Sequence, residues 1–270
     1  MPELPEVETS RRGIRPYVLG QTVLEVVVRE RRLRWPVPDG LEARLAGEPI
    51  RRLERRAKYL LFGTDAGTAL VHLGMSGSLR IIEPDEPPGR HDHVDIRLGN
   101  GKALRFRDPR RFGSLLWAEP GELHPLLAKL GPEPLADGFD GDWLWQRARG
   151  RRVAIKSFIM NAEVVVGVGN IYASEALFEA GIHPLRQAQR VSRVRMQRLA
   201  TAIRDVLNRA LAAGGTTLRD FSGGTGEPGY FRQQLNVYER AGRPCRRCGK
   251  PVRARVIGQR SSYYCTSCQA

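Results

Sequence analysis

The feature that most constrains the fold of this chain is the position of its cysteines. All four lie near the C-terminal end of the sequence, at Cys245, Cys248, Cys265 and Cys268. The spacing C-x2-C-x16-C-x2-C is typical of a tetrahedral Zn²⁺ site in which each pair comes from a tight turn. Four thiolates leave no open position for water, so the pattern predicts one structural zinc ion. Two disulfides are the alternative, which a reducing cytoplasm disfavours.

The charge of the chain narrows the class of its partner. The sequence has 44 Lys and Arg residues against 29 Asp and Glu, a formal net charge of +15. Residues 241–270 alone contain seven basic residues and no acidic one. This excess favours a polyanion as partner, and nucleic acid before a membrane surface. The cysteine-rich segment therefore has the charge needed to contact phosphates.

No stretch of the sequence has the pattern of a targeting or membrane-spanning segment. The first residues are acidic and lack the apolar run of a signal peptide. The longest apolar runs, such as residues 164–166, are far too short to cross a bilayer. We therefore expect a protein of a bacterial-type cytoplasm, with no membrane partner.

Hydrophobic patterning divides the chain into a strand-rich half and a helical half. Residues 5–20 are predicted to form a helix, and residues 22–118 contain seven short apolar segments separated by turns, which favours a β-sandwich or barrel. Beyond them the apolar spacing becomes helical, with Gly181 and Gly214 at predicted helix ends and Ser192 as a predicted N-cap. The predicted boundaries are 1–130 for the N-terminal domain, 131–140 for a linker, 141–235 for the helical domain and 236–270 for the zinc-binding segment.

The N-terminal sequence MPELPEVE places a proline directly after the initiator Met. Removal of Met ahead of a small residue leaves Pro2 with a secondary amine next to the Glu3 carboxyl group. An α-amine has a pKa of about 7.7–8.0, so a useful fraction is neutral and nucleophilic at neutral pH. The same residues are also compatible with a disordered tail or the start of a helix. From these residues alone, the role of the amine stays open.

Several other stretches combine charge with special backbone requirements. The segment RRLERRAK, at 51–58, is strongly basic, although a solvated strand or turn has the same composition. Met75 lies between glycines at the predicted tip of a strand–turn–strand. Residues 105–113 interleave four arginines with two phenylalanines, which suits phosphate contact and an apolar wedge between bases. A structural Arg–Asp network is the alternative. Residues 166–175 bring a Gly-rich turn to a helix N-terminus, where backbone N–H groups bind phosphate.

From residue 1 to residue 270, the chain resembles the formamidopyrimidine-DNA glycosylase family of base-excision repair enzymes. The resemblance rests on MPELPEVET, RRAKYLL, HLGMSGSL, DPRRFG, GVGNIYASE and the four-cysteine segment with QRSSYYC. Leu4 favours the oxidised-purine branch, because the related endonuclease VIII branch starts with PEGPE. The resemblance implies a multidomain α+β fold: an N-terminal β-sandwich with flanking helices, a helix–two-turn–helix domain and a C-terminal four-cysteine zinc finger. It also implies a monomer that binds damaged double-stranded DNA.

The resemblance further implies a reaction. Pro2 attacks the sugar of a flipped-out oxidised purine, 8-oxoguanine or a formamidopyrimidine, and the abasic site is then cleaved by β/δ-elimination through a Schiff base. Glu3 shuttles a proton as the sugar ring opens, and Glu6 positions the terminus. Lys58 contacts phosphate and assists base release. Arg260 grips the phosphates around the lesion and assists the second elimination.

The remaining implied roles concern DNA binding. Met75, Arg110 and Phe112 fill the space left by the flipped base, with Phe112 as the wedge and Arg110 directed toward the orphaned cytosine. The Gly-rich segment 221–231 closes over the everted base. Contacts with the DNA backbone are implied for His91, Arg151, Lys156 and Asn170.

Three other functions stay open on the sequence. An endonuclease VIII-like glycosylase for oxidised pyrimidines shares most of these motifs. A non-catalytic zinc-finger DNA-binding protein fits the charge and the cysteines, but not the Pro2–Glu3 start together with Lys58. A protein that binds RNA or phosphate without lesion chemistry fits the charge alone.

Overall fold

The computed structural model of the chain describes residues 2–215 and 234–270. The predicted loop at 221–231 lies outside the described residues. The chain divides into two compact units, residues 1–128 with 213–230 and residues 129–212 with 231–270. Among the helices of the described residues, none is both long enough and apolar enough to cross a membrane.

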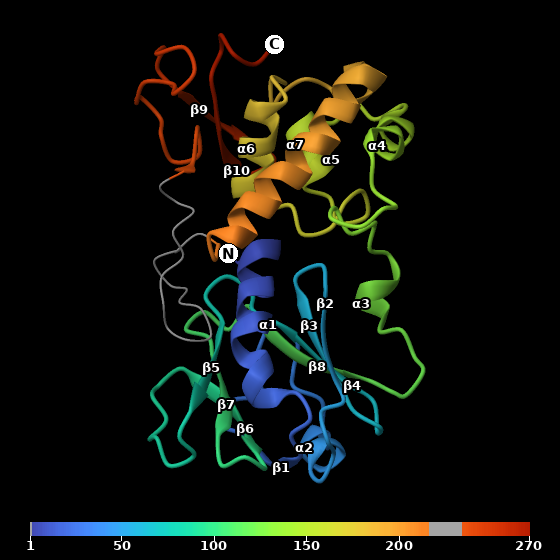
Figure 1. Cartoon of the computed structure of the whole chain (residues 1–270), viewed down its shortest axis with the longest axis vertical. Coiled ribbons are helices and arrows are strands. Elements are labelled where there is room, and N and C mark those ends of the chain that lie inside the picture. The colour runs from blue at the N-terminus through green and yellow to red at the C-terminus, as the bar shows by residue number, and fades with distance from the viewer. Residues whose placement is uncertain (1, 216–233) are drawn as a thin grey trace. The chain divides into compact units, whose positions relative to one another are not determined.

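The first unit is a sandwich of two antiparallel four-stranded sheets (Figure 1). The strand order is β1-β6-β7-β5 in one sheet and β2-β3-β4-β8 in the other. Inward-facing side chains of both sheets, such as Val94 and Leu60, pack in one core with Val7 and Ile14 of helix α1. All seven predicted strand segments are strands, which confirms the sandwich. The elements are α1 (Leu4–Val18), β1 (Val23–Val28), α2 (Leu41–Leu45), β2 (Arg52–Arg56), β3 (Tyr59–Gly63), β4 (Thr68–His72), β5 (Ser78–Ile82), β6 (Asp92–Leu98), β7 (Ala103–Arg107), β8 (Ser114–Ala118) and α3 (Pro125–Ala128).

Strand β2 is the strand that the apolar pattern did not predict. Its sequence RLERR has a single buried residue, Leu53, and pairs with β3 as an antiparallel hairpin. It lies at the edge of its sheet. Charged side chains are common on edge strands because they discourage pairing with another chain. The basic stretch at 51–58 is therefore an edge strand followed by a turn.

Helix α1 begins at Leu4 because Glu3 and Glu6 form a capping box around its first turn. Pro5 lies in that turn, where its missing N–H leaves no helical hydrogen bond unmade. The predicted end of the helix is confirmed: Gly20 follows the last turn with a φ of +80°, a conformation that favours glycine.

The second unit consists of helices and a two-stranded hairpin (Figure 1). Helices α4 and α7 approach so closely that a Cβ at Gly141 would lie 2.2 Å from the Gln197 Cα. The predicted N-cap is confirmed, because Ser192 Oγ accepts the Arg195 N–H at 3.5 Å. The elements are α4 (Gly141–Ala148), α5 (Ile155–Ile159), α6 (Asn170–Glu179), the 3-10 helix η1 (Ala188–Arg190), α7 (Arg193–Ala212), β9 (Arg253–Ile257) and β10 (Arg260–Tyr264).

Candidate DNA-binding and catalytic site

Pro2 and Glu3 are held at the start of helix α1. Pro2 is buried and Glu3 is only 2% exposed. The Glu3 N–H donates to Glu6 Oε2 at 2.9 Å, and the Glu3 carbonyl accepts the Val7 N–H at 3.1 Å. Glu6 is fully buried, so its carboxylate has the geometry to position the N-terminus. The sequence patterns did not indicate Gly215, where a Cβ would lie 3.1 Å from Glu6 Oε1.

Lys58 lies in the two-residue turn between β2 and β3. The residue before it, Ala57, has a φ of +55°, an unfavourable conformation for a residue with a Cβ. The Arg55 guanidinium donates to the Ala57 carbonyl at 3.0 Å and stabilises the turn. The half-buried Lys58 side chain is therefore presented from a fixed hairpin end.

His72, at the end of β4, connects the Lys58 turn to the next turn, residues 73–77. Its ring packs against Tyr59 with centroids 4.8 Å apart, and its Nδ1 accepts the Gly74 N–H at 3.0 Å. Burial, with the positive charges of Lys58 and Arg34, lowers the pKa of His72 to about 4. His72 is therefore neutral at pH 7 and keeps an acceptor for this turn. The motif HLGMSGSL predicted a role for Met75, and no role was predicted for His72.

One buried carboxylate organises both the Met75 turn and the turn at 108–113. Asp108 is fully buried. Its Oδ1 accepts the Ser76 hydroxyl at 2.7 Å, and its Oδ2 accepts the Gly113 N–H at 2.7 Å. The sequence suggested an Arg–Asp network at this aspartate, but its carboxylate accepts from a hydroxyl and from backbone N–H groups. Asp108 therefore joins two turns that are more than thirty residues apart in the sequence.

The two turns bring Met75, Arg110 and Phe112 into one region, as the resemblance implied. A Cβ at Gly74 would lie 2.4 Å from the Phe112 carbonyl carbon, so the two backbones are in direct contact. The Arg110 guanidinium lies 4.9 Å from the centroid of the Phe112 ring, which is 43% exposed. By contrast, Arg105 is buried and pairs with Asp95 at 2.8 Å. The Arg–Asp alternative is thus correct for Arg105.

Left-handed backbone conformations mark the turns that carry predicted site residues. In the described part of the chain, four non-glycine residues have a positive φ. Such a conformation costs about 1–2 kcal/mol for an L-residue, and strain of this kind clusters at active sites and ligand clamps. Three of the four adjoin predicted site residues: Ala57 precedes Lys58, Arg111 lies between Arg110 and Phe112, and Gln259 precedes Arg260.

His91 lies in a loop whose backbone is fixed from two sides. The Gly89 N–H donates to Asp92 Oδ2 at 2.7 Å, and the Asp108 N–H donates to the His91 carbonyl at 3.0 Å. The loop borders a cavity of about 600 Å³ within the first unit. Other basic residues that line this cavity are Arg29, Arg90 and Arg111.

In the second unit, a buried lysine links the helical segment to the β9–β10 hairpin. Lys156 is 1% exposed, and its Nζ donates to Asn170 Oδ1 at 2.6 Å and to Ser262 Oγ at 2.6 Å. Both Lys156 Nζ and Asn170 Nδ2 also donate to the Ser261 carbonyl, at 3.1 and 3.0 Å. This burial argues against the predicted direct contact of Lys156 with the DNA backbone. Its geometry is that of a positioning residue for Asn170 and for the chain next to Arg260.

Two further predicted contacts of the second unit are exposed. Arg260 begins strand β10, directly after the left-handed Gln259. Arg151 follows helix α4, and its carbonyl accepts the Gln189 N–H at 3.0 Å. Both guanidinium groups are therefore carried by fixed backbone at the surface of this unit.

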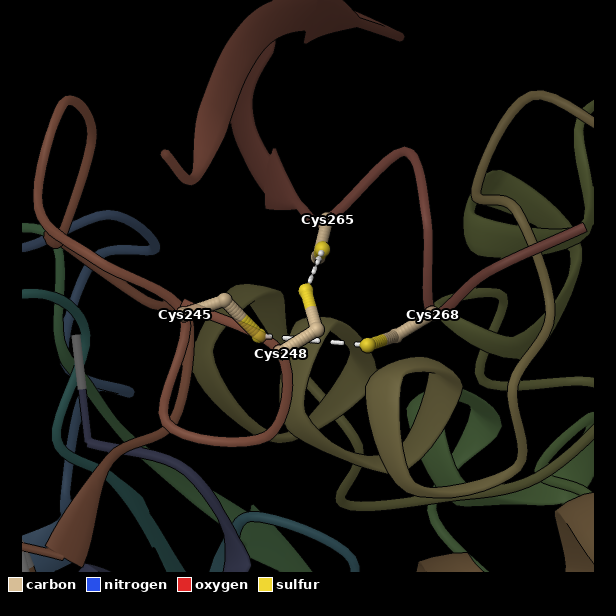
Figure 2. Close-up of side chains that lie close together, drawn as sticks. All are labelled: Cys245, Cys248, Cys265 and Cys268. Atoms are coloured by element: carbon tan, nitrogen blue, oxygen red, sulfur yellow. Dashed lines mark hydrogen bonds between the residues drawn. The ribbon is translucent and has the colours of Figure 1, made fainter. Parts of the chain in front are cut away.

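The four cysteines converge on one point (Figure 2). All four Sγ atoms lie within 4.8 Å of one another. The sulfur distances are 3.9 Å for Cys245–Cys268 and 3.4 Å for Cys248–Cys265, so neither pair is a disulfide. A Zn–S bond of about 2.3 Å places the sulfurs of a tetrahedral site about 3.8 Å apart. The donor set and its spacing fit the predicted structural zinc.

The joint deprotonation of these four thiols requires a cation. Burial raises the pKa of Cys265, but N–H hydrogen bonds from Cys268 and Ser267 outweigh it and bring the pKa to about 7. Burial and the neighbouring thiols raise the pKa of Cys268 to about 12. Four thiolates do not form together at neutral pH without a compensating charge, which Zn²⁺ supplies.

A buried glutamate fixes the start of the zinc-binding segment on helix α6. Glu175 is 2% exposed, and its carboxylate accepts the N–H groups of Asn236, Val237 and Tyr238 at 2.7–2.9 Å. Charge-assisted hydrogen bonds of this kind are stronger than neutral ones. The sequence motif GVGNIYASE indicated a phosphate-binding turn but not this role of its last residue. A contact over about sixty residues has no local sequence signal.

Comparison with known families covers most of the chain. Models of the formamidopyrimidine-DNA glycosylase N-terminal domain and H2TH domain match residues 1–115 and 130–222. A model of the zinc finger found in FPG and IleRS matches residues 242–270. The chain belongs to the formamidopyrimidine-DNA glycosylase family. The fold of this family, a β-sandwich, a helix–two-turn–helix domain and a four-cysteine zinc finger, is the one predicted from the sequence.

Similar proteins agree over the full length. The chain is 62% identical to formamidopyrimidine-DNA glycosylase of Syntrophotalea carbinolica and 60% identical to that of Alkalilimnicola ehrlichii, with all of both chains covered. The crystal structure of MutM (Fpg) from Thermus thermophilus has a TM-score of 0.90 at 40% identity, covering 99% of this chain and 98% of that one. Fpg of Lactococcus lactis in complex with DNA containing an abasic site has a TM-score of 0.92 at 31% identity, covering 99% of each chain.

Proposed function

We propose that this chain acts on damaged DNA through its N-terminal proline. As a member of its family it is a base-excision repair glycosylase and abasic-site lyase for formamidopyrimidine and oxidised-purine lesions in DNA. One observation carries the proposal for Pro2: buried Glu6 accepts the Glu3 N–H at 2.9 Å and fixes the chain start. The Pro2 amine and the Glu3 carboxyl group are thereby held in a fixed geometry. Covalent catalysis with proton transfer requires such a geometry.

The proposed reaction begins when the Pro2 nitrogen, exposed by removal of Met, attacks C1′ of the lesion sugar. The bond from C1′ to the base breaks, and the base leaves with the electron pair and takes up a proton. The sugar ring then opens to an iminium ion between Pro2 and C1′. This positive nitrogen withdraws electrons, so C2′ loses a proton and the 3′ phosphate leaves. A second proton loss expels the 5′ phosphate, and water hydrolyses the remaining iminium.

Three other side chains have proposed roles in these steps. Glu3 transfers a proton to the sugar oxygen as the ring opens, and its burial keeps the carboxyl group in place. Lys58 contacts phosphate and assists base release. Arg260, exposed at the start of β10, neutralises the phosphate that leaves in the second elimination.

We place the damaged duplex against the Met75 and Phe112 turns. The support is an exposed aromatic ring with the Arg110 guanidinium 4.9 Å from its centroid. An apolar wedge with a flanking cation suits the space left by a flipped base. Contacts with the DNA backbone are proposed for exposed Arg151 and for the half-buried His91 and Asn170. We further propose that the protein acts as a monomer on the DNA of the bacterial nucleoid.

A blocked N-terminus tests the function of Pro2. One extra residue ahead of Pro2 converts its nitrogen into a tertiary amide, whose lone pair is delocalised. We expect the blocked protein to bind duplex DNA containing an abasic site without cutting it or being trapped by borohydride. Pro2→Gly keeps a primary amine and should retain part of the activity. Normal cleavage by the blocked protein would refute the mechanism.

A panel of substrates separates the remaining functions. The protein with a processed N-terminus should excise 8-oxoguanine and formamidopyrimidines from duplex DNA. Preferential excision of oxidised pyrimidines would indicate endonuclease VIII-like activity. Binding of DNA with no cleavage of any lesion or abasic site would indicate a zinc-finger binding protein. Stronger binding of RNA than of damaged duplex would favour an RNA-binding protein.

Glu3→Gln separates the two chemical steps. Glutamine has an amide in place of the carboxyl group and cannot transfer a proton as Glu3 does, so base excision should be lost. A preformed abasic site has no base to release, so some cleavage of it should remain. Equal loss of both activities would contradict the assigned role of Glu3.

A further inference from the structure

Helix α1 carries a further buried glutamate that the proposed reaction does not use. Glu8 is 8% exposed, and it follows Glu3 by five residues, which is about 7.5 Å along the helix axis. Its carboxylate accepts hydrogen bonds from Arg11 Nη2 at 2.7 Å and from Arg55 Nε at 3.3 Å. Arg55 belongs to strand β2. Glu8 therefore joins the helix that begins beside Pro2 to the strand that leads to Lys58.

Arg55 uses two nitrogens of its guanidinium group for two different partners. Its Nε faces Glu8, and its Nη1 donates to the Ala57 carbonyl at 3.0 Å. This carbonyl belongs to the peptide group that joins Ala57 to Lys58. The Arg55 side chain is only 12% exposed, so little water competes for these hydrogen bonds. A continuous series of hydrogen bonds thus runs from helix α1 to the backbone of Lys58.

The peptide group before Lys58 has a conformation that needs support from its surroundings. Ala57 has a φ of +55°, which is unfavourable for a residue with a Cβ. Such a conformation persists only where neighbouring groups hold it in place. Without the hydrogen bond from Arg55, Ala57 can relax toward an ordinary φ, which rotates this peptide group and redirects the Lys58 side chain.

A neighbouring arginine links the same helix and strand without reaching this turn. Arg11 donates to Glu8 from its Nε at 2.9 Å and from its Nη2, and its Nη1 donates to the Leu53 carbonyl at 3.1 Å. Leu53 lies in β2, ahead of the turn. Arg11 therefore attaches the strand to the helix, whereas Arg55 also holds the peptide group of Lys58.

Glu8 carries a negative charge at neutral pH. Burial raises the pKa of its carboxyl group, but hydrogen bonds and charges from three arginines outweigh burial and lower the pKa; these are Arg11, Arg12 and Arg55. A charged acceptor forms a stronger hydrogen bond to a guanidinium group than a neutral one does. Replacement of Glu8 by glutamine should therefore weaken its hold on Arg55.

We propose that Glu8 and Arg55 are positioning residues for Lys58, and that they fix its side chain relative to the helix that carries Pro2 and Glu3. This inference rests on the proposed function, in which Lys58 contacts phosphate and assists base release. Catalytic groups require precise placement, because a displacement of about 1 Å can reduce a rate about a hundredfold. Glu8 and Arg55 act through Lys58 and are not catalytic residues themselves.

Single-turnover excision of 8-oxoguanine from duplex DNA tests this role. Arg55→Gln and Glu8→Gln should each slow excision about tenfold. Arg11→Gln should slow it less, because the hydrogen bond to the Ala57 carbonyl remains. Glu25→Gln, at an exposed position of β1, should excise at the wild-type rate. Circular dichroism checks that each variant is folded, and Glu8→Gln tests the same link from the side of the helix. Equal rates for Arg55→Gln and Arg11→Gln would overturn the proposal.

A double-mutant cycle with Lys58 separates positioning from general stabilisation. If Arg55 acts through Lys58, Arg55→Gln should slow excision about tenfold in the wild-type background but no more than about twofold in the Lys58→Ala background. A role in stability alone would give the same slowing in both backgrounds, and this result would overturn the proposal. Excision by Lys58→Ala at the wild-type rate would also overturn it, because Lys58 would then have no role to position.

Borohydride trapping keeps this inference distinct from the proposed function. Wild-type protein that neither excises the lesion nor is trapped on abasic duplex would overturn the proposed function, and the positioning role with it. If the wild-type protein excises and is trapped, and Arg55→Gln and Glu8→Gln excise at the same rate, only the positioning role is overturned.

Discussion

The turns of the first unit and the zinc finger of the second unit both carry proposed DNA contacts, but they are stabilised differently. The two turns that Asp108 joins, at 73–77 and 108–113, rest on the hydrophobic core between the two sheets. The zinc finger has a small core, in which Phe178 and Val237 pack with two of the cysteines. Its strand β9 is exposed at four of five positions. Packing and one carboxylate fix the first surface, whereas a metal and the polar anchors Lys156 and Glu175 fix the second.

This difference predicts how much of each surface loses its structure when one stabilising group is removed. In the first unit, removing one polar group loosens turns on a scaffold that stays folded. In the zinc finger, removing the metal removes the largest stabilising term, because so few apolar side chains are buried there.

Removal of zinc should have the largest effect. Structural zinc sites bind with apparent free energies of about 10–16 kcal/mol, and this energy is folding energy. The protein should contain one zinc per chain, and chelation should abolish DNA binding while circular dichroism shows that the β-rich half remains folded. Absence of metal in reduced, active protein, or unchanged DNA affinity after chelation, would contradict this account.

Replacement of the buried carboxylate in the first unit should come next. Asp108→Asn keeps the size of the side chain but loses charge-assisted bonds to Ser76 and Gly113. We expect a loss of about 3 kcal/mol in unfolding free energy, measured by urea denaturation, and weaker binding of lesion duplex. The control is Asp65→Asn, an exposed partner of Arg51, which should change little. Equal effects of the two variants would show that Asp108 does not organise the turns.

The pH dependence of stability should report on His72. Its pKa is about 4 in the folded protein, against an ordinary value of 6.5, because its half-buried ring is partly removed from water and lies near the positive charges of Lys58 and Arg34. Between pH 6.5 and 4 the unfolded chain binds a proton that the folded chain does not, so stability falls as the pH falls. The loss from this residue is up to about 3 kcal/mol.

The variant His72→Asn keeps an acceptor for Gly74 but does not titrate. Its stability relative to wild type should be constant from about pH 7 to 8 and should improve below about pH 6.5. A difference between the two proteins that is independent of pH would contradict the neutral state of His72 in the folded protein.

The wedge substitution should have the smallest effect on stability. Phe112 is 43% exposed, so Phe112→Ala should change the unfolding free energy by no more than about 0.5 kcal/mol. Binding of lesion duplex should weaken about tenfold, because the space left by the flipped base is no longer filled. Binding of single strands should change less. Leu123→Ala, also exposed, is the control. Equal losses for duplex and single strands would show that Phe112 only supports the fold.

Local signals were enough to predict much of this molecule. Apolar alternation predicted the seven core strands, cysteine spacing predicted the zinc site, and the helical pattern of residues 5–20 predicted helix α1. Strand β2 was not predicted, because an edge strand with one buried residue lacks the apolar pattern.

The interactions that position the site residues had no local signal. Lys156 was predicted to face DNA, but its partners at residues 261 and 262 are more than 100 positions away. Asp108 and Glu175 likewise hold segments that are distant in the sequence. A motif thus indicates which residues belong to the site, whereas the tertiary fold decides which of them face the ligand.

The most direct test of the central claim is peptide mapping of the adduct trapped by borohydride between the processed protein and abasic duplex DNA. The account predicts that the reduced sugar remnant is on the nitrogen of Pro2, with Glu3 and Lys58 unmodified. A remnant on Lys58 or on any other lysine would show that Pro2 is only a terminus and would contradict the mechanism.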